Sequence, residues 1–287
     1  MTVQIPKIMN VLLKLKSYGL SEGTLKFVSD RLKYIARHCN LDDSREVLSF
    51  ITSRQCSLSY KESLVKAYSY YARCYNIQYV KPRFRYERKL PKIPTRENIM
   101  KIISASKKYG VIFKVLMETG IMPHELSRVR FEDIDFENNI LTVRGFKGHS
   151  SRVFKLPDDT IAMLRTYFNK YSSFPDSKWI CKMWIKTRNK VASKLHDPSI
   201  KSIRLYDLRH YYATMLYNKT KDILYVKQQL GHKKIETTLI YTQLVNFPND
   251  DYYSAIATNV EEARKLIESG FEYITTFDNI MLFRKRK

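Results

Sequence analysis

The chain has 287 residues, of which 51 are Lys or Arg and 28 are Asp or Glu, so its formal net charge is +23 at pH 7. This excess of positive charge favours a polyanion such as nucleic acid as the partner. A content of 44% hydrophobic residues allows buried cores, and the length favours two domains. No apolar run approaches the roughly 20 residues of a membrane span and no hydrophobic signal core opens the sequence, so we expect a cytoplasmic protein with no membrane partner.

Residues 1–80 are predicted to form an all-helical unit. Ser21 is suited to cap a helix, and apolar residues recur every three or four positions over 25–35. A shorter helix is predicted around Arg45–Ile51, and another, rich in aromatic residues along one side, over Tyr60–Tyr75. We interpret these aromatic side chains as core rather than as a surface that stacks on bases.

Residues 81–95 are predicted to form a basic linker. The segment contains three prolines and six basic residues against one acid, which is typical of an extended, cationic connection. Such a linker is suited to follow a phosphate backbone, and a merely solvated linker is the alternative. The candidate DNA contacts in it are Lys81, Arg83, Arg85, Arg88 and Lys89.

A second unit is predicted over residues 96–245. Thr95 is placed to begin its first helix, and two strands, Ile140–Val143 and Arg152–Leu156, are joined by a turn that contains glycines. Two further helices are predicted after this hairpin, over Asp159–Tyr171 and Lys182–Leu195.

The helix predicted over Asp207–Met215 carries the first candidate site residues. Apolar residues recur in it at helical spacing. Tyr206 and Arg209 are three residues apart, so we expect them to share one face of the helix and to address one phosphate.

The next helices carry two more candidates. The segment Asp222–Leu230 is predicted to be a helix that ends at Gly231, a normal C-terminal stop, which leaves His232 in the loop just beyond. Lys234–Leu244 is then predicted to be a helix that carries Tyr241.

The last segment, residues 246–287, is predicted to contain a helix and a hairpin. Thr258–Glu262 has the character of a helix cap, and the helix is expected to run to Gly270. Two strands follow and turn at Asp278–Asn279. The positive charge lies elsewhere, because residues 242–287 contain six basic and seven acidic residues and the other 45 basic and 21 acidic residues precede them.

The sequence favours neither a metal nor a nucleotide cofactor. The four cysteines, Cys39, Cys56, Cys74 and Cys181, are scattered without a Cys-x-x-Cys pair or matching histidines, so neither a zinc site nor a disulfide framework is predicted. No glycine-rich loop of the kind that cradles phosphates occurs, so ATP is not implied.

The motifs of the second unit together resemble the signature of the tyrosine recombinase and phage integrase family, of the Xer-like or archaeal type. Leu205–His210 is similar to the His-x-x-Arg box of that family, and Leu230–His232 followed by Tyr241 is similar to its second histidine and its nucleophile. Thr119–Leu126 is similar to the Thr-Gly-Leu-Arg-x-x-Glu-Leu box. The hairpin turn resembles Gly-Lys-Gly-x-Lys-x-Arg and puts Lys147 where the family keeps its lysine.

This resemblance covers roughly residues 95–245 and implies both a fold and an activity. The fold would be mainly α (α+β), with a helical core-binding domain at 1–80 and a mostly helical DNA breaking-rejoining catalytic domain at 96–245 that contains a small β-hairpin sheet. The activity would be a site-specific recombinase or integrase that cuts and rejoins double-stranded DNA through a 3′-phosphotyrosine, without a cofactor, as a homo-tetramer on DNA. Family members often pass a C-terminal element to a neighbouring subunit, so the tail at 246–287 either does this or packs on its own domain.

The resemblance assigns roles to five residues. Tyr241 is the expected nucleophile, Arg209 the clamp on the phosphate oxygens, His232 and Tyr206 phosphate donors, and Lys147 the acid for the departing 5′ oxygen. These residue types suit the reaction, because metal-free cleavage of DNA needs a nucleophile, cations on the phosphate oxygens and an acid, and a guanidinium matches two phosphate oxygens. Each residue alone is more typical of packing or of a solvated charge, and only their joint spacing favours a site.

Two positions depart from the family pattern. The first catalytic arginine of the family falls on Met122, whose thioether offers a phosphate neither charge nor an N–H donor. Tyr206 stands where many relatives have histidine, which is a milder change because a phenol also donates a hydrogen bond. Met122 makes a non-catalytic or weakly active DNA-binding protein on the same fold the alternative to a recombinase.

Overall fold

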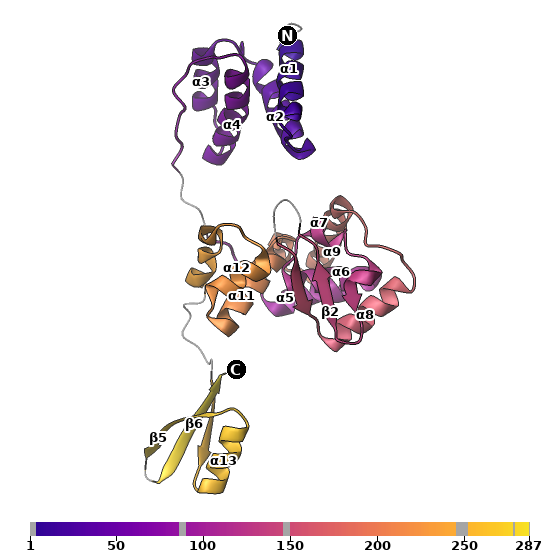
Figure 1. The fold of residues 1–287 in the computed structure, drawn as a ribbon, viewed down its shortest axis with the longest axis vertical. Helices are drawn as coiled ribbons and strands as arrows, with labels where there is room; N and C mark the ends of the chain where they lie inside the picture. The colour runs from indigo at the N-terminus through magenta and orange to yellow at the C-terminus, as the bar shows by residue number, and fades with distance from the viewer. Residues whose placement is uncertain (1–3, 86–89, 146–149, 245–251, 278, 287) are drawn as a thin grey trace. The chain divides into compact units, whose positions relative to one another are not determined.

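The computed structural model describes residues 4–85, 90–145, 150–244, 252–277 and 279–286. It divides into two compact units, Met1–Lys89 and Leu90–Lys287. Helices dominate both units, and the strands form two small antiparallel sheets (Figure 1). The predicted mainly α fold with a small hairpin sheet is therefore confirmed. None of the helices among the described residues is long and apolar enough to cross a membrane.

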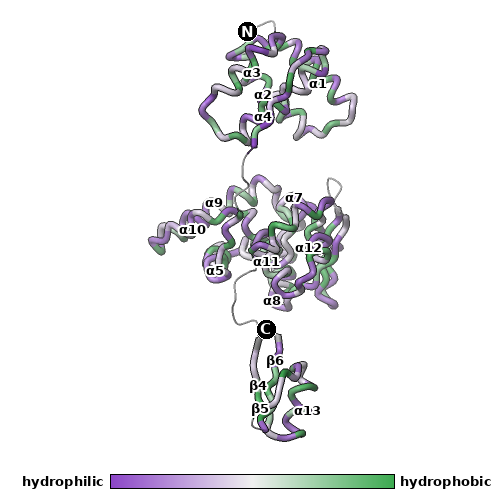
Figure 2. Tube along the Cα trace, turned by 90° about the vertical axis from the view of Figure 1, so that its left-hand side faces the viewer, coloured by the Kyte–Doolittle hydropathy of each residue, from purple (hydrophilic) through white to green (hydrophobic). Residues whose placement is uncertain are grey.

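The first unit consists of helices with a shared core. Their bounds are Gln4–Ser17 (α1), Glu22–Ala36 (α2), Ser44–Ser53 (α3) and Leu58–Cys74 (α4). The hydroxyl of Ser21 caps α2 and a carboxylate oxygen of Asp43 caps α3, so that polar side chains satisfy backbone N–H groups at both helix starts. Hydrophobic and hydrophilic residues alternate along these helices (Figure 2), which allows one side of each to be buried.

The aromatic residues of α4 lie mostly in this core, as predicted. Tyr68 and Tyr71 are fully buried. The hydroxyl of Tyr68 donates to the carbonyl of Leu41 at 3.1 Å, and that of Tyr71 donates to a carboxylate oxygen of Asp42 at 2.8 Å. Desolvation and the neighbouring acidic groups raise the pKa of Tyr68 to about 12. Because the hydroxyls are satisfied inside the protein, these rings stabilise the helical unit rather than face a partner.

The second unit packs its helices around a large hydrophobic core. Its helical elements up to residue 244 are α5 (Arg96–Ala105), η1 (Lys107–Tyr109), α6 (Gly110–Thr119), α7 (Pro123–Leu126), η2 (Phe131–Asp133), α8 (Asp158–Phe168), α9 (Ser177–Lys194), α10 (Pro198–Ser202), α11 (Asp207–Thr220), α12 (Ile223–Leu230), η3 (Ile235–Thr237) and η4 (Leu239–Leu244). Thr95 caps α5 as predicted, since its hydroxyl accepts from the N–H of Asn98.

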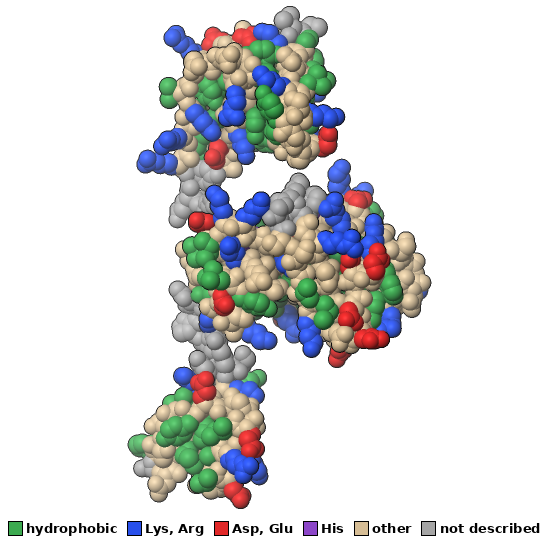
Figure 3. Space-filling view, viewed as in Figure 1, with side chains coloured by type: hydrophobic (Ala, Val, Ile, Leu, Met, Phe, Trp, Pro, Cys, Tyr) green, Lys and Arg blue, Asp and Glu red, His purple; other side chains and the backbone are tan. Residues whose placement is uncertain are grey.

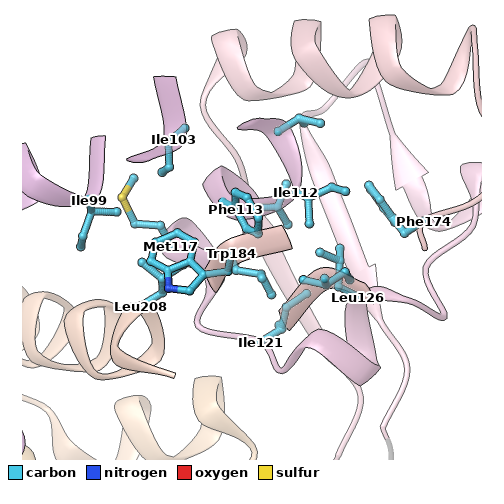
Figure 4. Close-up of a cluster of buried hydrophobic side chains, with 14 of the residues drawn as sticks. Ile99, Ile103, Ile112, Phe113, Met117, Ile121, Leu126, Phe174, Trp184 and Leu208 are labelled. Atoms are coloured by element: carbon cyan, nitrogen blue, oxygen red, sulfur yellow. The ribbon is translucent and has the colours of Figure 1, made fainter. Parts of the chain in front are cut away.

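Helix α6 is the centre of this core, because nearly all of its residues are buried. Figure 4 shows Phe113 and Met117 of α6 beside Trp184 of α9 and Leu208 of α11. The Phe113 and Trp184 rings meet edge to face with centroids 5.0 Å apart, and the indole N–H of Trp184 donates to the carbonyl of Ile203 at 3.0 Å. The core thus fixes the starts of α7 and α11, which carry the candidate site.

A three-stranded antiparallel sheet, ordered β1-β2-β3, completes this part of the unit. Its strands are Ile134–Asp135 (β1), Ile140–Val143 (β2) and Arg152–Lys155 (β3), and Val143 pairs with Arg152 next to the turn that joins β2 to β3. The two predicted hairpin strands are confirmed, and β1 adds a short third strand. Residues 146–149, with the candidate acid Lys147, lie outside the described residues.

The C-terminal residues form a separate small sheet with one helix. Strands Tyr252–Ala257 (β4), Glu272–Phe277 (β5) and Ile280–Arg286 (β6) are antiparallel in the order β4-β6-β5, and Val260–Glu268 (α13) packs on the sheet. The predicted helix and the β5–β6 hairpin are confirmed, whereas β4 was not predicted. Figure 3 shows hydrophobic side chains gathered on this sheet.

Two predicted helix boundaries are wrong. Residues 234–244 form the two short 3-10 helices η3 and η4 instead of one α-helix. The hydroxyl of Thr238, buried between them, bonds the ring of His232, six residues earlier. Helix α9 begins at Ser177, five residues before the predicted start, because a carboxylate oxygen of Asp176 accepts from the N–H groups of Lys178 and Trp179.

Candidate active site

Arg209 lies at the centre of the candidate site. It is in the first turn of α11, and its side chain is buried with 3% of the residue exposed. Its guanidinium donates to the carbonyl of Gly120 at 2.6 Å and to the carbonyl of Leu230 at 2.6 Å. These two carbonyls come from segments about 90 and 20 residues away, so Arg209 ties three of the sequence motifs together.

The contact with Gly120 depends on a left-handed turn. Helix α6 ends at Gly120, where φ is +63°, a conformation that favours glycine. A Cβ at this position would lie 2.4 Å from the ring of Tyr212, so close packing also excludes a side chain. The glycine of the Thr-Gly pair therefore lets the chain turn so that its carbonyl reaches Arg209.

The contact with Leu230 depends on a second left-handed glycine. Helix α12 ends at Gly231, where φ is +70°, as the sequence predicts. The carbonyl of Leu230 accepts hydrogen bonds from both Arg209 and Arg152, at 2.6 and 2.9 Å. The C-terminal end of α12, which leads directly into His232, is thus held by two guanidinium groups.

Tyr241 reaches the same place from η4. It is buried with 1% of the residue exposed, and its hydroxyl lies 3.1 Å from Nδ1 of His210. The ring of His210 also contacts the ring of Tyr206 edge to face, with centroids 4.8 Å apart. Tyr206 is 43% exposed, so it is the most accessible member of this cluster. The structure thus brings Arg209, Tyr206 and Tyr241 together around His210.

Burial favours the neutral forms of the Tyr241 phenol and the His210 imidazole. Desolvation, reinforced by nearby Tyr206, raises the pKa of the Tyr241 phenol above its ordinary value, and the guanidinium of Arg209 opposes this increase. Desolvation also lowers the pKa of His210, despite the opposing effect of Asp207. A protonated phenol therefore faces an uncharged imidazole, and Nδ1 is able to accept the phenolic proton when the ring carries its hydrogen on Nε2.

His232 lies beside this cluster. Its Nδ1 is 2.9 Å from the hydroxyl of Thr238, which is fully buried. A hollow of about 270 Å³ is lined by His232 together with Lys227, Lys233 and Ser150. The half-buried imidazole is therefore at the edge of a basic recess, where an anion would be attracted.

The turn that contains Met122 is intact, although the residue is not the arginine of the family pattern. Met122 precedes α7, and its N–H donates to a carboxylate oxygen of Glu125 at 2.8 Å. Glu125 is itself buried and pairs with Arg152 of β3. Met122 is half-buried, so it is not part of the fully buried core.

Two functional candidates were not predicted from the sequence. His210 contacts the candidate nucleophile, and its position directly after Arg209 was the only available signal. Arg152 shares the Leu230 carbonyl with Arg209, and it was assigned only to a strand. The closing arginine of the Gly-Lys-Gly-x-Lys-x-Arg pattern was the available signal for Arg152, whereas its burial was visible only in the structure.

The predicted linker contacts are only partly described. Lys81, Arg83 and Arg85 are exposed, whereas Arg88 and Lys89 lie outside the described residues. Figure 3 shows further Lys and Arg side chains distributed over the surfaces of both units. In the described part of the chain there is no group of three or more His, Cys, Asp or Glu that is placed to hold a metal ion.

The model of the phage integrase family matches residues 94–246. Among curated proteins, the chain is 30% identical over 171 residues to the tyrosine recombinase XerA of Pyrococcus furiosus, a match that covers 54% of this chain and 58% of that protein. It is 26% identical over 260 residues to a tyrosine recombinase of Thermosipho africanus, covering 79% of this chain and 90% of that protein. The chain thus spans little more than half the length of the Pyrococcus relative.

Solved structures resemble the fold. A lambda integrase tetramer bound to a Holliday junction matches 85% of this chain and 78% of that chain, with a TM-score of 0.65 and 15% identity. The integrase of the transposon Tn1549 in complex with transposon right end DNA matches 91% of this chain and 98% of that chain, with a TM-score of 0.63 and 15% identity. At these identities the likeness concerns the fold alone.

Proposed function

The chain belongs to the phage integrase family, and from this premise we propose that it is a site-specific tyrosine recombinase that cuts and rejoins double-stranded DNA. The observation that carries the proposal is the cluster around His210, which brings the phenol of Tyr241 on η4 to the imidazole of His210 and the buried guanidinium of Arg209 on α11. Each is a group that metal-free cleavage of a phosphodiester requires.

We propose the following roles in cleavage. The oxygen of Tyr241 attacks phosphorus and forms a phosphotyrosine at the 3′ side, while the bond from phosphorus to the 5′ oxygen breaks. Nδ1 of His210 receives the phenolic proton, and Lys147 protonates the departing 5′ oxygen. Arg209 holds the phosphate, with Tyr206 and His232 as further donors. Attack of a 5′ hydroxyl from the partner strand on the phosphotyrosine reverses these steps and completes the exchange.

Burial of the nucleophile adds a requirement to this scheme. Since only 1% of Tyr241 is exposed, the phosphate meets its hydroxyl only after η4 moves or the side chains over it shift. The short 3-10 helices that flank Thr238 are weaker than an α-helix, so such a movement is less costly here than in a regular helix.

We propose supporting roles for the remaining parts of the chain. Residues 1–80 would act as a core-binding domain, 81–95 as a linker that contacts phosphates through its basic residues, 96–245 as the catalytic domain and 246–287 as a helix-hairpin tail. Exchange between two duplexes needs four nucleophiles, so a homo-tetramer on DNA is proposed, with no cofactor. An enzyme that acts on DNA in this way would work in the cytoplasm.

A covalent adduct is the direct test of this function. Genomic DNA fragments selected by the protein would supply the binding site, which would then be nicked so that the cleaved end diffuses away and the phosphotyrosine accumulates. We expect an adduct that resists denaturation and maps to Tyr241. Specific binding without any adduct would instead support a non-catalytic DNA-binding protein.

Replacing His210 is expected to slow cleavage and to change its pH dependence. His210→Asn keeps a polar side chain but removes the base, so cleavage should fall by about 10²–10⁴. In the native protein the rate should rise with pH as His210 loses its proton, at a pH below the ordinary imidazole value because burial lowers its pKa, and then level off. Single-turnover rates from pH 5 to 9 would measure this. A variant with the native profile would remove His210 from the reaction.

Replacing Met122 with arginine is expected to accelerate cleavage. The turn around it is intact, so a guanidinium at position 122 would be directed toward the phosphate held by Arg209. One preorganised donor is typically worth about 10²–10³ in rate, which sets the upper limit of the gain. Met122→Leu serves as the control, because it changes shape without adding charge. A rate that does not rise in Met122→Arg would mean that another cation already acts on the phosphate.

A further inference from the structure

Two buried guanidinium groups meet at one carbonyl beside the candidate nucleophile. Arg152 and Arg209 both donate to the carbonyl of Leu230, and Arg152 also donates to the carbonyl of Gln229 at 3.3 Å and pairs with Glu125. Only 4% of Arg152 and 3% of Arg209 are exposed. Because they share an acceptor atom, the two cations are held within hydrogen-bond distance of the same point.

The charges of this cluster do not balance. Arg152 and Arg209 contribute two positive charges, and Glu125, which is also buried, contributes one negative charge. The Nε–H groups of both arginines are buried and have no acceptor among the described residues. Burial of an unpaired charge and of unsatisfied donors is costly, so the cluster is incomplete as it stands and would be stabilised by an anion with oxygen acceptors.

We propose that Arg152 is a second phosphate-binding arginine, which together with Arg209 holds the scissile phosphate of DNA. This inference rests on the proposed function and gives a role to Arg152, which the five role assignments from the resemblance do not include. A phosphodiester carries one negative charge and two non-bridging oxygens, which match the excess charge and the two free Nε–H donors of the cluster.

The position of Arg152 also explains how the chain tolerates Met122. Glu125 connects the two residues, since its two carboxylate oxygens bind the N–H of Met122 and the guanidinium of Arg152. Arg152 therefore places a cation beside the turn that lacks one. Arg130 is close to Met122 in sequence but is exposed and has no comparable bonds to Leu230. The gain from Met122→Arg is accordingly expected to lie below the upper limit of about 10²–10³.

The test compares two substrates that differ in phosphate charge. One is the normal nicked site, and the other carries a methylphosphonate at the scissile position, where a methyl group replaces a charged oxygen. Arg152→Gln should lower the ratio of the cleavage rates on the phosphodiester and the methylphosphonate by about 10², because an uncharged phosphorus centre has less need of the lost cation. Since both rates come from one protein preparation, the folded fraction cancels in this ratio. An unchanged ratio would make Arg152 a structural residue and overturn the proposal.

A second measurement tests the same idea through Met122. The increase in cleavage rate caused by Met122→Arg should be at least tenfold larger in the Arg152→Gln variant than in the native protein. Equal increases in the two proteins would contradict the proposal. Arg152→Lys, which keeps the buried charge, replaces Arg152→Gln if the latter does not fold. Its ratio of cleavage rates on the two substrates should lie between the native ratio and the roughly hundredfold lower ratio expected for Arg152→Gln. Arg130→Gln is the matched control and should leave the ratio unchanged. Absence of any adduct with the native protein would instead refute the recombinase function itself.

Discussion

Tyr241→Phe is expected to abolish covalent attachment to DNA while binding stays nearly unchanged. The substitution removes the attacking oxygen and leaves the ring that fills the core formed with Val226 and Leu230. It also removes the hydrogen bond to His210, which is worth about 1 kcal/mol of folding stability. Denaturing electrophoresis of the protein with a nicked site measures attachment, and a gel-shift titration measures binding. We expect no adduct and an affinity within about twofold of native.

Tyr217→Phe is the matched control for this substitution. Tyr217 packs against the same cluster as Tyr241, but no role in the chemistry is assigned to it. Its variant should form the adduct at the native rate. If Tyr241→Phe still becomes attached to DNA, another tyrosine is the nucleophile, and the assignment of the whole cluster would have to be abandoned.

Arg209→Ala is expected to have the second largest effect. Removal of a guanidinium that stabilises transition-state charge should lower the cleavage rate by about 10³–10⁵. Affinity should fall far less, because binding is distributed over many phosphates while the charge that develops during cleavage is local. Single-turnover cleavage and equilibrium binding at one salt concentration would be measured on the same preparations.

The structural role of Arg209 requires its own control. The side chain holds the carbonyls of Gly120 and Leu230 in the interior, so alanine leaves both without this donor. Arg209→Lys retains the charge, and thermal unfolding of both variants reports the loss of stability. Equal losses of rate and affinity in Arg209→Ala would show that Arg209 is an ordinary DNA contact rather than the phosphate clamp.

Much of the local structure was predictable because its causes are local. Capping residues such as Ser21 and Thr95 fix helix starts through bonds to nearby N–H groups, and Gly231 ends α12 because the chain turns there with a positive φ. Hairpin strands follow from short apolar segments around a glycine-containing turn. The spacing of Arg209, His232 and Tyr241 also follows from the sequence alone, and with it the resemblance to the family.

Tertiary structure decided how these residues meet. That Arg209 binds the carbonyls of two remote turns, and that the phenol of Tyr241 rests on His210, depends on the packing of α11 between α6 and η4. The sequence also did not show that residues 234–244 form two 3-10 helices, with Thr238 between them bonded to His232.

The sequence by itself thus determined the fold class, several helix boundaries set by local caps, such as those at Ser21 and Thr95, and the identity of the candidate nucleophile and clamp. Only the tertiary structure revealed the buried charge of Arg152 and its link to Met122 through Glu125. The physical reason is that desolvation and the pairing of charges depend on which segments come together in space. Residues 122, 152 and 230 are far apart in the sequence, so no local pattern indicates that they lie close together.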